Sequence, residues 1–500
     1  MNRIFILAAC LLLSSAEYYA QSLYSRKWSA LIPITEVTTK PFTTDKKLVR
    51  ISAFVTTVHP KTGNLYVVNS FGNSIYEYTQ KNNKPTLIYK FPENHTGTTV
   101  IENLTFDKDN HLIFSGRTVV ENFATTGAYS EKLIFGVRVA PSYIKKISLK
   151  GDVIWATYFH DIPTTAASLT VDEDNNIYVL NKRNKNTVAS PTYFQKNGDL
   201  NSSIEYQDVI SKLDKDGKHL WSTFYTQNAS SIKSIVAGKT GLYIYGDHVG
   251  ATIDSTYFGT PNSHLEKISR PNAKLSNVFS VFLSKFSFEG TRLWSTYVGE
   301  HNTNVALGGT LMNNNSLTVV NDEPYILTTN KIFLDQKRDI ATTKSLYKKP
   351  FSQGNTNTVT KFNAQGKMLW NSFVQSGDYL FSNGNELIIS STIAIDDNNL
   401  NSPDILKPYQ AKFGGNTDVY TTALSLDGTT LNYGSFYGFA GSDSGVTIPT
   451  SKGFYILGNT DLNTTSKTLF STSKGSGSEL SQKGDVYIGD FISYFKRKGK

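Results

Sequence analysis

Histidine, carboxylate and asparagine side chains recur in short polar segments that follow a series of aromatic-rich stretches. They are Glu93 and His95, His160 and Asp161, Asn228, Glu300 and His301, Asp378, and Asp443. If these segments met at one mouth, a histidine beside carboxylates could act as base and acid on a bound sugar, or the group could hold a divalent cation. The same residue types are ordinary turn residues, so a purely structural role stays open.

We divide this set by chemistry. His160, Asp161, Glu300 and His301 are the catalytic candidates, because each histidine adjoins a carboxylate. The ligand-binding candidates are His95, Asn228, Asp378 and Asp443. We expect no resident cofactor; a structural or bridging divalent cation is the one inorganic partner that these residue types suit.

Other motifs are weaker. The segment 172–176 begins like a calcium loop, but Arg183 stands where such a loop needs its twelfth-position Glu, so a plain turn is the better interpretation. The sequence contains no nucleophile elbow, no His-Glu-x-x-His and no phosphate loop. Cys10 is the only cysteine, which leaves no disulfide and no cysteine-ligated metal.

The elements that must position these residues repeat along the chain. Four segments align without gaps, at 144–159, 210–225, 283–298 and 359–374, and each carries Gly four residues before Trp. The pairs are Gly151/Trp155, Gly217/Trp221, Gly290/Trp294 and Gly366/Trp370. Each segment predicts a strand, a tight glycine turn and a second strand. A fifth copy keeps Gly428 and has Asn432 in place of Trp, and a sixth is degenerate, with Asn82-Asn83 as its turn.

A second kind of hairpin precedes each copy and brings the count to seven of each kind. The incoming strand at 491–495 has no outgoing partner before the chain ends, and Trp28 opens the missing strand near the N-terminus. The sequence therefore predicts an all-β, seven-bladed β-propeller of four-stranded blades, whose last blade is shared between residues 22–34 and 446–500. Sharing that blade removes free sheet edges, so deleting 487–500 should unfold the domain, whereas trimming 496–500 should do much less.

The pattern resembles the seven-bladed β-propeller repeat family of bacterial secreted proteins. The segments that carry the resemblance are Phe413-Gly-Gly-Asn-Thr-Asp-Val-Tyr420, Trp294-Ser-Thr-Tyr297 and Leu242-Tyr-Ile-Tyr-Gly246. The resemblance implies this fold and export, and it implies no single activity. The Gly-Trp spacing also resembles the docking repeat of quinoprotein alcohol dehydrogenases. Those propellers have eight blades, and many carry a vicinal disulfide, which this chain lacks.

The N-terminus and the charge set the expected compartment and partners. A basic start, an apolar run and small residues predict a signal peptide over 1–20, leaving 21–500 as a single exported domain; a lipoprotein anchored at Cys10 is the alternative. No later segment is apolar enough to span a membrane. The net charge of +9 favours polyanions, but no nucleic-acid motif accompanies it. We expect a monomer.

If both short turns of every blade share one face, the long connections share the other. These connections are 116–142, 181–208, 247–278, 330–357, 393–418 and 459–484. Long loops on a rigid scaffold often bind ligands, although they can equally wrap the blades. We therefore expect a secreted or cell-surface module that binds a glycan or another surface polymer without catalysis. The alternatives are a lyase or hydrolase of acidic polysaccharide, with His160 or His301 as base, and a structural component of an envelope assembly.

Overall fold

A computed structural model describes most of the chain. The described residues are 22–32, 55–69, 72–95, 98–133, 141–159, 162–163, 169–190, 193–227, 229–249, 256–267, 279–301, 316–332, 354–374, 377–394, 404–439, 441–463, 481–483 and 486–499. The signal peptide and lipoprotein predictions lie outside these residues.

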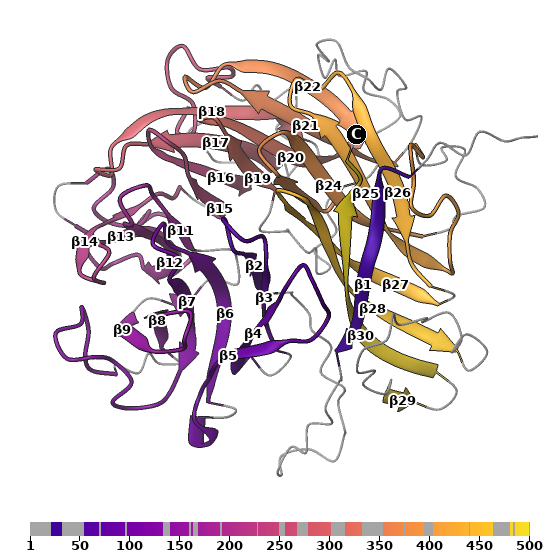
Figure 1. The fold of residues 1–500 in the computed structure, drawn as a ribbon. Coiled ribbons are helices and arrows are strands. Elements are labelled where there is room, and N and C mark those ends of the chain that lie inside the picture. The colour runs from indigo at the N-terminus through magenta and orange to yellow at the C-terminus, as the bar shows by residue number, and fades with distance from the viewer. Residues whose placement is uncertain are drawn as a thin grey trace, which may run out of the picture.

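Seven four-stranded antiparallel blades follow one another around a ring (Figure 1). Within each blade the strands run A to D from the axis outward. Blades 1 to 3 are β2 (Thr56–Val58), β3 (Leu65–Val68), β4 (Ser74–Tyr78) and β5 (Thr86–Lys90); β6 (Thr99–Phe106), β7 (Leu112–Thr118), β8 (Ser142–Ile147) and β9 (Val153–Phe159); and β11 (Leu169–Val171), β12 (Ile177–Asn184), β13 (Tyr206–Leu213) and β14 (His219–Phe224). Blades 4 and 5 are β15 (Ala229–Ala237), β16 (Leu242–Val249), β17 (Phe279–Phe286) and β18 (Arg292–His301); and β19 (Leu317–Val320), β20 (Glu323–Ile332), β21 (Gly354–Phe362) and β22 (Met368–Val374).

Blades 6 and 7 complete the ring. Blade 6 is β23 (Tyr379–Ser382), β24 (Glu386–Ala394), β25 (Thr417–Ser425) and β26 (Leu431–Tyr437), and blade 7 is β27 (Ser442–Thr450), β28 (Gly453–Asn463), β30 (Val486–Arg497) and β1 (Tyr24–Ile32). A parallel bridge between Thr417 and Ser442 joins these two blades into one nine-stranded sheet. The short strands β10 (Ile162–Pro163) and β29 (Ser481–Lys483) add to blades 3 and 7, and a 3-10 turn, η1 (Glu93–His95), follows blade 1.

The N-terminal strand closes the ring as predicted. β1 pairs antiparallel with β30, with Trp28 opposite Tyr494, and Figure 1 shows the indigo strand lying beside the yellow one. Trp28 is buried, and Asn83 of blade 1 donates to Ser29 O at 2.9 Å. The closing strand extends to Arg497, whose Nη1 lies 3.0 Å from Glu386 Oε2, so trimming from residue 496 would remove its last two residues.

The repeated Gly and Trp pack between blades. Four of the five Trp on strand D lie against the hairpin glycine of the following blade, where an added Cβ would lie 2.7 to 3.3 Å from the ring. The contacts are Trp155 with Gly217, Trp221 with Gly290, Trp294 with Gly366 and Trp370 with Gly428. Three of the indoles also donate to a carbonyl of that next hairpin: Trp155 to Lys215, Trp221 to Phe288 and Trp294 to Ala364. The Gly and the Trp of one hairpin therefore contact two different neighbours, the Trp of the preceding blade and the Gly of the following blade.

In blade 6 the Trp position is taken by Tyr433. Tyr433 lies opposite Ala423, as Trp221 lies opposite Lys212 in blade 3, so the sequence-based alignment to Asn432 was one residue short. The blade 6 hairpin has one more residue between its glycine and the aromatic residue, which an ungapped alignment misses. Tyr433 is buried and its ring lies 4.8 Å from that of Tyr24.

The long B–C connections wrap their blades in the segments that the structure describes. The backbone N–H group of Thr125 donates to a carbonyl of β9, and that of Thr260 donates to a carbonyl of β18. Segment 404–410 forms two β-bridges with β26. In blade 3, Phe224 N donates to Gln195 O. An outermost strand has unpaired backbone groups, and these segments satisfy some of them. The described parts of these connections therefore serve the scaffold, which is the structural alternative to ligand binding.

Candidate functional site

The structure describes only part of the predicted site. His160, Asp161 and Asn228 lie outside the described residues. Glu300 and His301 were predicted in a connection near the axis. Instead they end β18, the outermost strand of blade 4, opposite Ser280 and Phe279. Since strand D lies farthest from the axis, these two positions belong to the rim and not to the channel mouth. A strand that extends further than its repeat pattern indicates accounts for the difference.

His95 does lie in a connection, at the end of η1, and it adjoins a buried lysine. The pKa of His95 is lowered because burial and the Lys145 charge both disfavour the imidazolium. Lys145 is buried; its Nζ lies 3.8 Å from the Phe123 ring centroid and donates to Tyr89 Oη at 3.1 Å. Burial lowers the Lys145 pKa to about 8. The surrounding aromatic rings offer the cation a favourable face, and nothing in the repeat pattern indicated this lysine.

An ion pair occupies the same position in blades 2 and 4, with its charges exchanged. Strand A of each blade has a β-bulge, at Glu102 in β6 and at Lys233 in β15. The partner on strand B follows a glycine in both cases: Arg117 lies 2.6 Å from Glu102, and Asp247 lies 3.5 Å from Lys233. The bulge turns a strand A side chain towards its neighbour on strand B. Sequence analysis missed these pairs because their members are 14 or 15 residues apart.

Blade 3 extends the pair in blade 4 into a four-residue group, which we call the inner charge cluster: Lys182, Asp208, Lys233 and Asp247. Lys182 lies 3.0 Å from the buried Asp208, whose other oxygen accepts from Ile232 N at 2.7 Å. Asp208 thereby joins blade 3 to the bulge of blade 4. Burial raises the pKa of Asp247, with the charge of Asp208 adding to the rise and Lys233 opposing it. The side chains of Arg117, Lys182 and Lys233 are 43%, 33% and 21% exposed, so all three cations reach solvent.

The junction of blades 6 and 7 holds carboxylates surrounded by amides. Asp418 is fully buried, and its Oδ2 accepts from Gln410 Nε2 at 2.8 Å and from Gly414 N at 2.9 Å. Burial raises its pKa against those amide hydrogen bonds. Asp443, one of the predicted residues, is equally buried and accepts from Phe439 N.

Asp378, also predicted, lies on the same side of blade 6 but is exposed. Its Oδ2 accepts from Thr392 N at 3.1 Å, and Thr392 Oγ1 accepts from Gly445 N of blade 7 at 3.4 Å. Short hydrogen-bonded steps thus connect Asp378 to the strand that carries Asp443. His95 lies beside Phe91 and Lys145 of blades 1 and 2, whereas Asp378 and Asp443 lie at blades 6 and 7.

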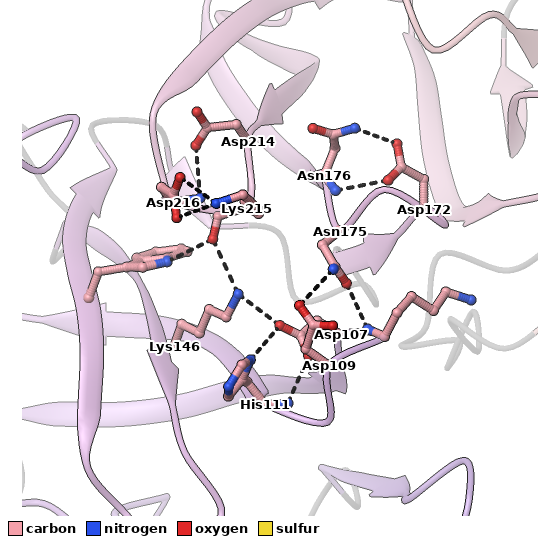
Figure 2. A network of polar contacts seen from close by, with 12 residues as sticks. Asp107, Asp109, His111, Lys146, Asp172, Asn175, Asn176, Asp214, Lys215 and Asp216 are labelled. Atoms are coloured by element: carbon pink, nitrogen blue, oxygen red, sulfur yellow. Dashed lines mark hydrogen bonds and ion pairs between the residues drawn. The ribbon is translucent and has the colours of Figure 1, made fainter.

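Figure 2 shows a polar network on the opposite face, where Asp107, Asp109 and His111 come close together. Lys146 Nζ lies 2.7 Å from Asp107 Oδ2, and Asn175 Nδ2 donates to Asp109 Oδ2 at 2.9 Å. A lysine and an amide already satisfy the oxygens that a metal ion would need, so the network joins blades 2 and 3. Asp172 accepts from the backbone of its own turn, which agrees with interpreting segment 172–176 as a plain turn.

Comparisons with known proteins give only distant likenesses. No family model and no curated protein matches the sequence. Among solved structures, the polysaccharide lyase Uly1 aligns over 96% of this chain and 98% of its own, with a TM-score of 0.45 and 9% identity. The Dos1 propeller aligns over 88% and 87%, with a TM-score of 0.34 and 10% identity. Quinohemoprotein alcohol dehydrogenase from Comamonas testosteroni aligns over 88% and 66%, with a TM-score of 0.37 and 11% identity. Likenesses this distant carry no inference about activity.

Proposed function

We propose that this chain is an exported, monomeric propeller of the bacterial secreted repeat type, which binds an acidic glycan or another anionic surface polymer without catalysis. One observation carries the proposal: three partly exposed cations, Arg117, Lys182 and Lys233, lie on the inner strands of three consecutive blades. Each cation is held by a carboxylate partner and is still open to solvent, as a polar binding surface requires.

The charge of the whole chain supports the same partner. The net charge is +9, and a basic protein attracts polyanions over a distance set by the ionic strength. Arg117 and Lys182 occupy equivalent positions on strand B of blades 2 and 3, while blades 5 and 6 have Thr329 and Thr392 there. Three cations on neighbouring blades suit an extended polymer that lies across those blades. No helix among the described residues has the length and apolarity to cross a membrane.

The test compares two triple variants of equal charge. Arg117→Gln, Lys182→Gln and Lys233→Gln remove the three inner cations. The control variant carries Lys81→Gln, Lys150→Gln and Lys218→Gln, three exposed lysines on the turns of the opposite face. Affinity for alginate or heparin should fall about tenfold in the first variant, since each exposed contact contributes roughly 0.5 kcal/mol. The control should bind nearly as the wild type does.

The measurement is affinity electrophoresis at two salt concentrations, with dextran as the neutral polymer, below the melting temperature of every variant. Equal loss in both variants would mean diffuse attraction and would contradict a defined surface. The same polymers should be followed at 235 nm for unsaturated products. Sustained turnover by the wild type would contradict a non-catalytic role and favour the lyase alternative.

A further inference from the structure

Two buried carboxylates meet where blade 6 passes into blade 7. Asp418 lies on β25 and Asp443 on β27, one residue beyond the bridge between Thr417 and Ser442 that joins the blades. Both residues are 0% exposed. Two ionised carboxylates that are this close and this buried repel each other, and each loses the hydration that it has in water.

The two side chains point into the same space in front of Gly438. The position that a Cβ on Gly438 would take lies 2.1 Å from Asp418 Oδ1 and 2.9 Å from Asp443 Oδ2. Oxygens bound to one Ca²⁺ can be up to about 5 Å apart, because each Ca–O bond is about 2.3 to 2.6 Å long. Two oxygens at those distances from a common point satisfy this limit.

Asp418 Oδ1 is the second observation. It is fully buried and has no hydrogen-bond partner among the described residues. The other oxygen, Oδ2, is satisfied by Gln410 and Gly414. A buried polar atom without a partner is rare, because leaving it unsatisfied has a free-energy cost. This oxygen approaches Gly438, as Asp443 Oδ2 does, so a cation bound by both carboxylates would satisfy it.

Blade 3 shows that the fold does not require an acid at this position. Gln207 takes the place of Asp418 there. Gln207 lies five residues before Lys212, which pairs with Trp221. Asp418 lies five residues before Ala423, which pairs with Tyr433 in the same way. Gln207 is buried, and its amide makes hydrogen bonds to Asp199 and Ile204 of its own connection. A neutral amide at this position therefore binds its connection with both its oxygen and its nitrogen. Asp418 binds its connection with Oδ2 alone, and its Oδ1 has no hydrogen-bond partner among the described residues.

We propose that Asp418 and Asp443 bind a divalent cation, of which Ca²⁺ is the best fit, between their carboxylates. Calcium prefers oxygen ligands, and carboxylates are among those that it binds most often. The ion ties the end of blade 6 to the first strand of blade 7, next to the point where the ring closes. The proposal is independent of polymer binding.

The test begins with the wild-type protein, dialysed against EDTA and then into metal-free buffer. Binding of Ca²⁺ is measured by calorimetry and Tb³⁺ by luminescence, with one equivalent expected for each. Ca²⁺ at 100 times its Kd should raise Tm by about 3 °C for a chain of this length. A wild type that binds neither ion would overturn the proposal, whatever the variants do.

Variants locate the ion. Asp418→Asn should lose both the stoichiometric binding and the Tm shift, because it removes the charge and keeps the shape. Asp208→Asn is the matched control: its carboxylate is equally buried but faces Lys182, so the Ca²⁺ shift should remain. Gly438→Ala is a second route if Asp418→Asn folds poorly, since its methyl group would occupy the space of the Asp418 carboxylate. A Ca²⁺ shift that survives in Asp418→Asn would place the ion elsewhere and refute this site.

Discussion

The junction between blades 3 and 4 and the junction between blades 6 and 7 both contain buried carboxylates, but the carboxylates have different partners. Both place two carboxylates at the end of the inner strands. Asp208 and Asp247 are each held by a lysine, Lys182 and Lys233 respectively. Asp418 has only amide donors around Oδ2, and its Oδ1 faces Asp443.

The difference separates scaffold from function. A carboxylate with a lysine partner can be buried at modest cost, because the two charges compensate each other. Such a pair supports the fold and offers its exposed cation to a ligand. At the second junction, Asp418 Oδ1 is buried and has no hydrogen-bond partner among the described residues, which is the observation behind the proposed cation. The two proposals accordingly assign different partners to the two junctions, a polyanion at blades 2 to 4 and a small cation at blades 6 and 7.

Deleting residues 487–500 should have the largest effect, and it should act on the second junction first. The deletion removes most of β30, the partner of both β28 and β1, and leaves Trp28 without its strand. Burial of that indole alone contributes roughly 2 to 3 kcal/mol. We expect the cooperative melting transition to be lost. Calorimetry checks this, with removal of residues 498–500 as the control; an unchanged transition would contradict ring closure through blade 7.

Removing the lysines of the inner charge cluster should make the first junction behave like the second. Lys182→Met and Lys233→Met together leave two buried carboxylates without their counter-ions, at a cost of about 2–4 kcal/mol. Urea unfolding measures the loss. Each single substitution should cost less than half of the total if the four charges act as one group. Additive losses would show that the two pairs are independent.

Placing an acid in blade 3 tests whether the equivalent positions are truly comparable. Gln207→Glu should destabilise the protein by about 1–3 kcal/mol, because the amide donates to Asp199 O and Ile204 O and a carboxylate cannot. Urea unfolding again gives the magnitude. A neutral outcome would mean that the connection rearranges easily and that Gln207 is a poor reference for Asp418.

The pH dependence of Asp418 should give the smallest effect. Burial raises its folded pKa above the unfolded value, so the cost of the ionised group is present in full above the folded pKa. That cost disappears as the pH falls to about 4, the unfolded value. In EDTA, acidification over this window should therefore stabilise the wild type relative to Asp418→Asn. Parallel stability curves for the two proteins would contradict a raised pKa.

The sequence by itself determined the architecture. Gly217 with Trp221 and its equivalents, together with the divided repeat at Trp28 and 491–495, were enough to predict seven blades and their closure, because a repeated hairpin must stack on its copies to bury its aromatic side. The repeat also placed Asp378 and Asp443 at connections between blades, where the structure finds them beginning strands of blades 6 and 7 or immediately preceding them.

Only the tertiary structure decided which charges meet. A β-bulge brings Glu102 to Arg117, and a bridge between two blades brings Asp418 to Asp443. Neither a bulge nor a contact between blades can be predicted from the spacing of residues along the chain. The sequence also could not show that the described B–C segments pair with outer strands, since that depends on an edge that exists only once the blade has formed. Local periodicity determines the strands, whereas the position of a charge depends on contacts between residues far apart in the chain.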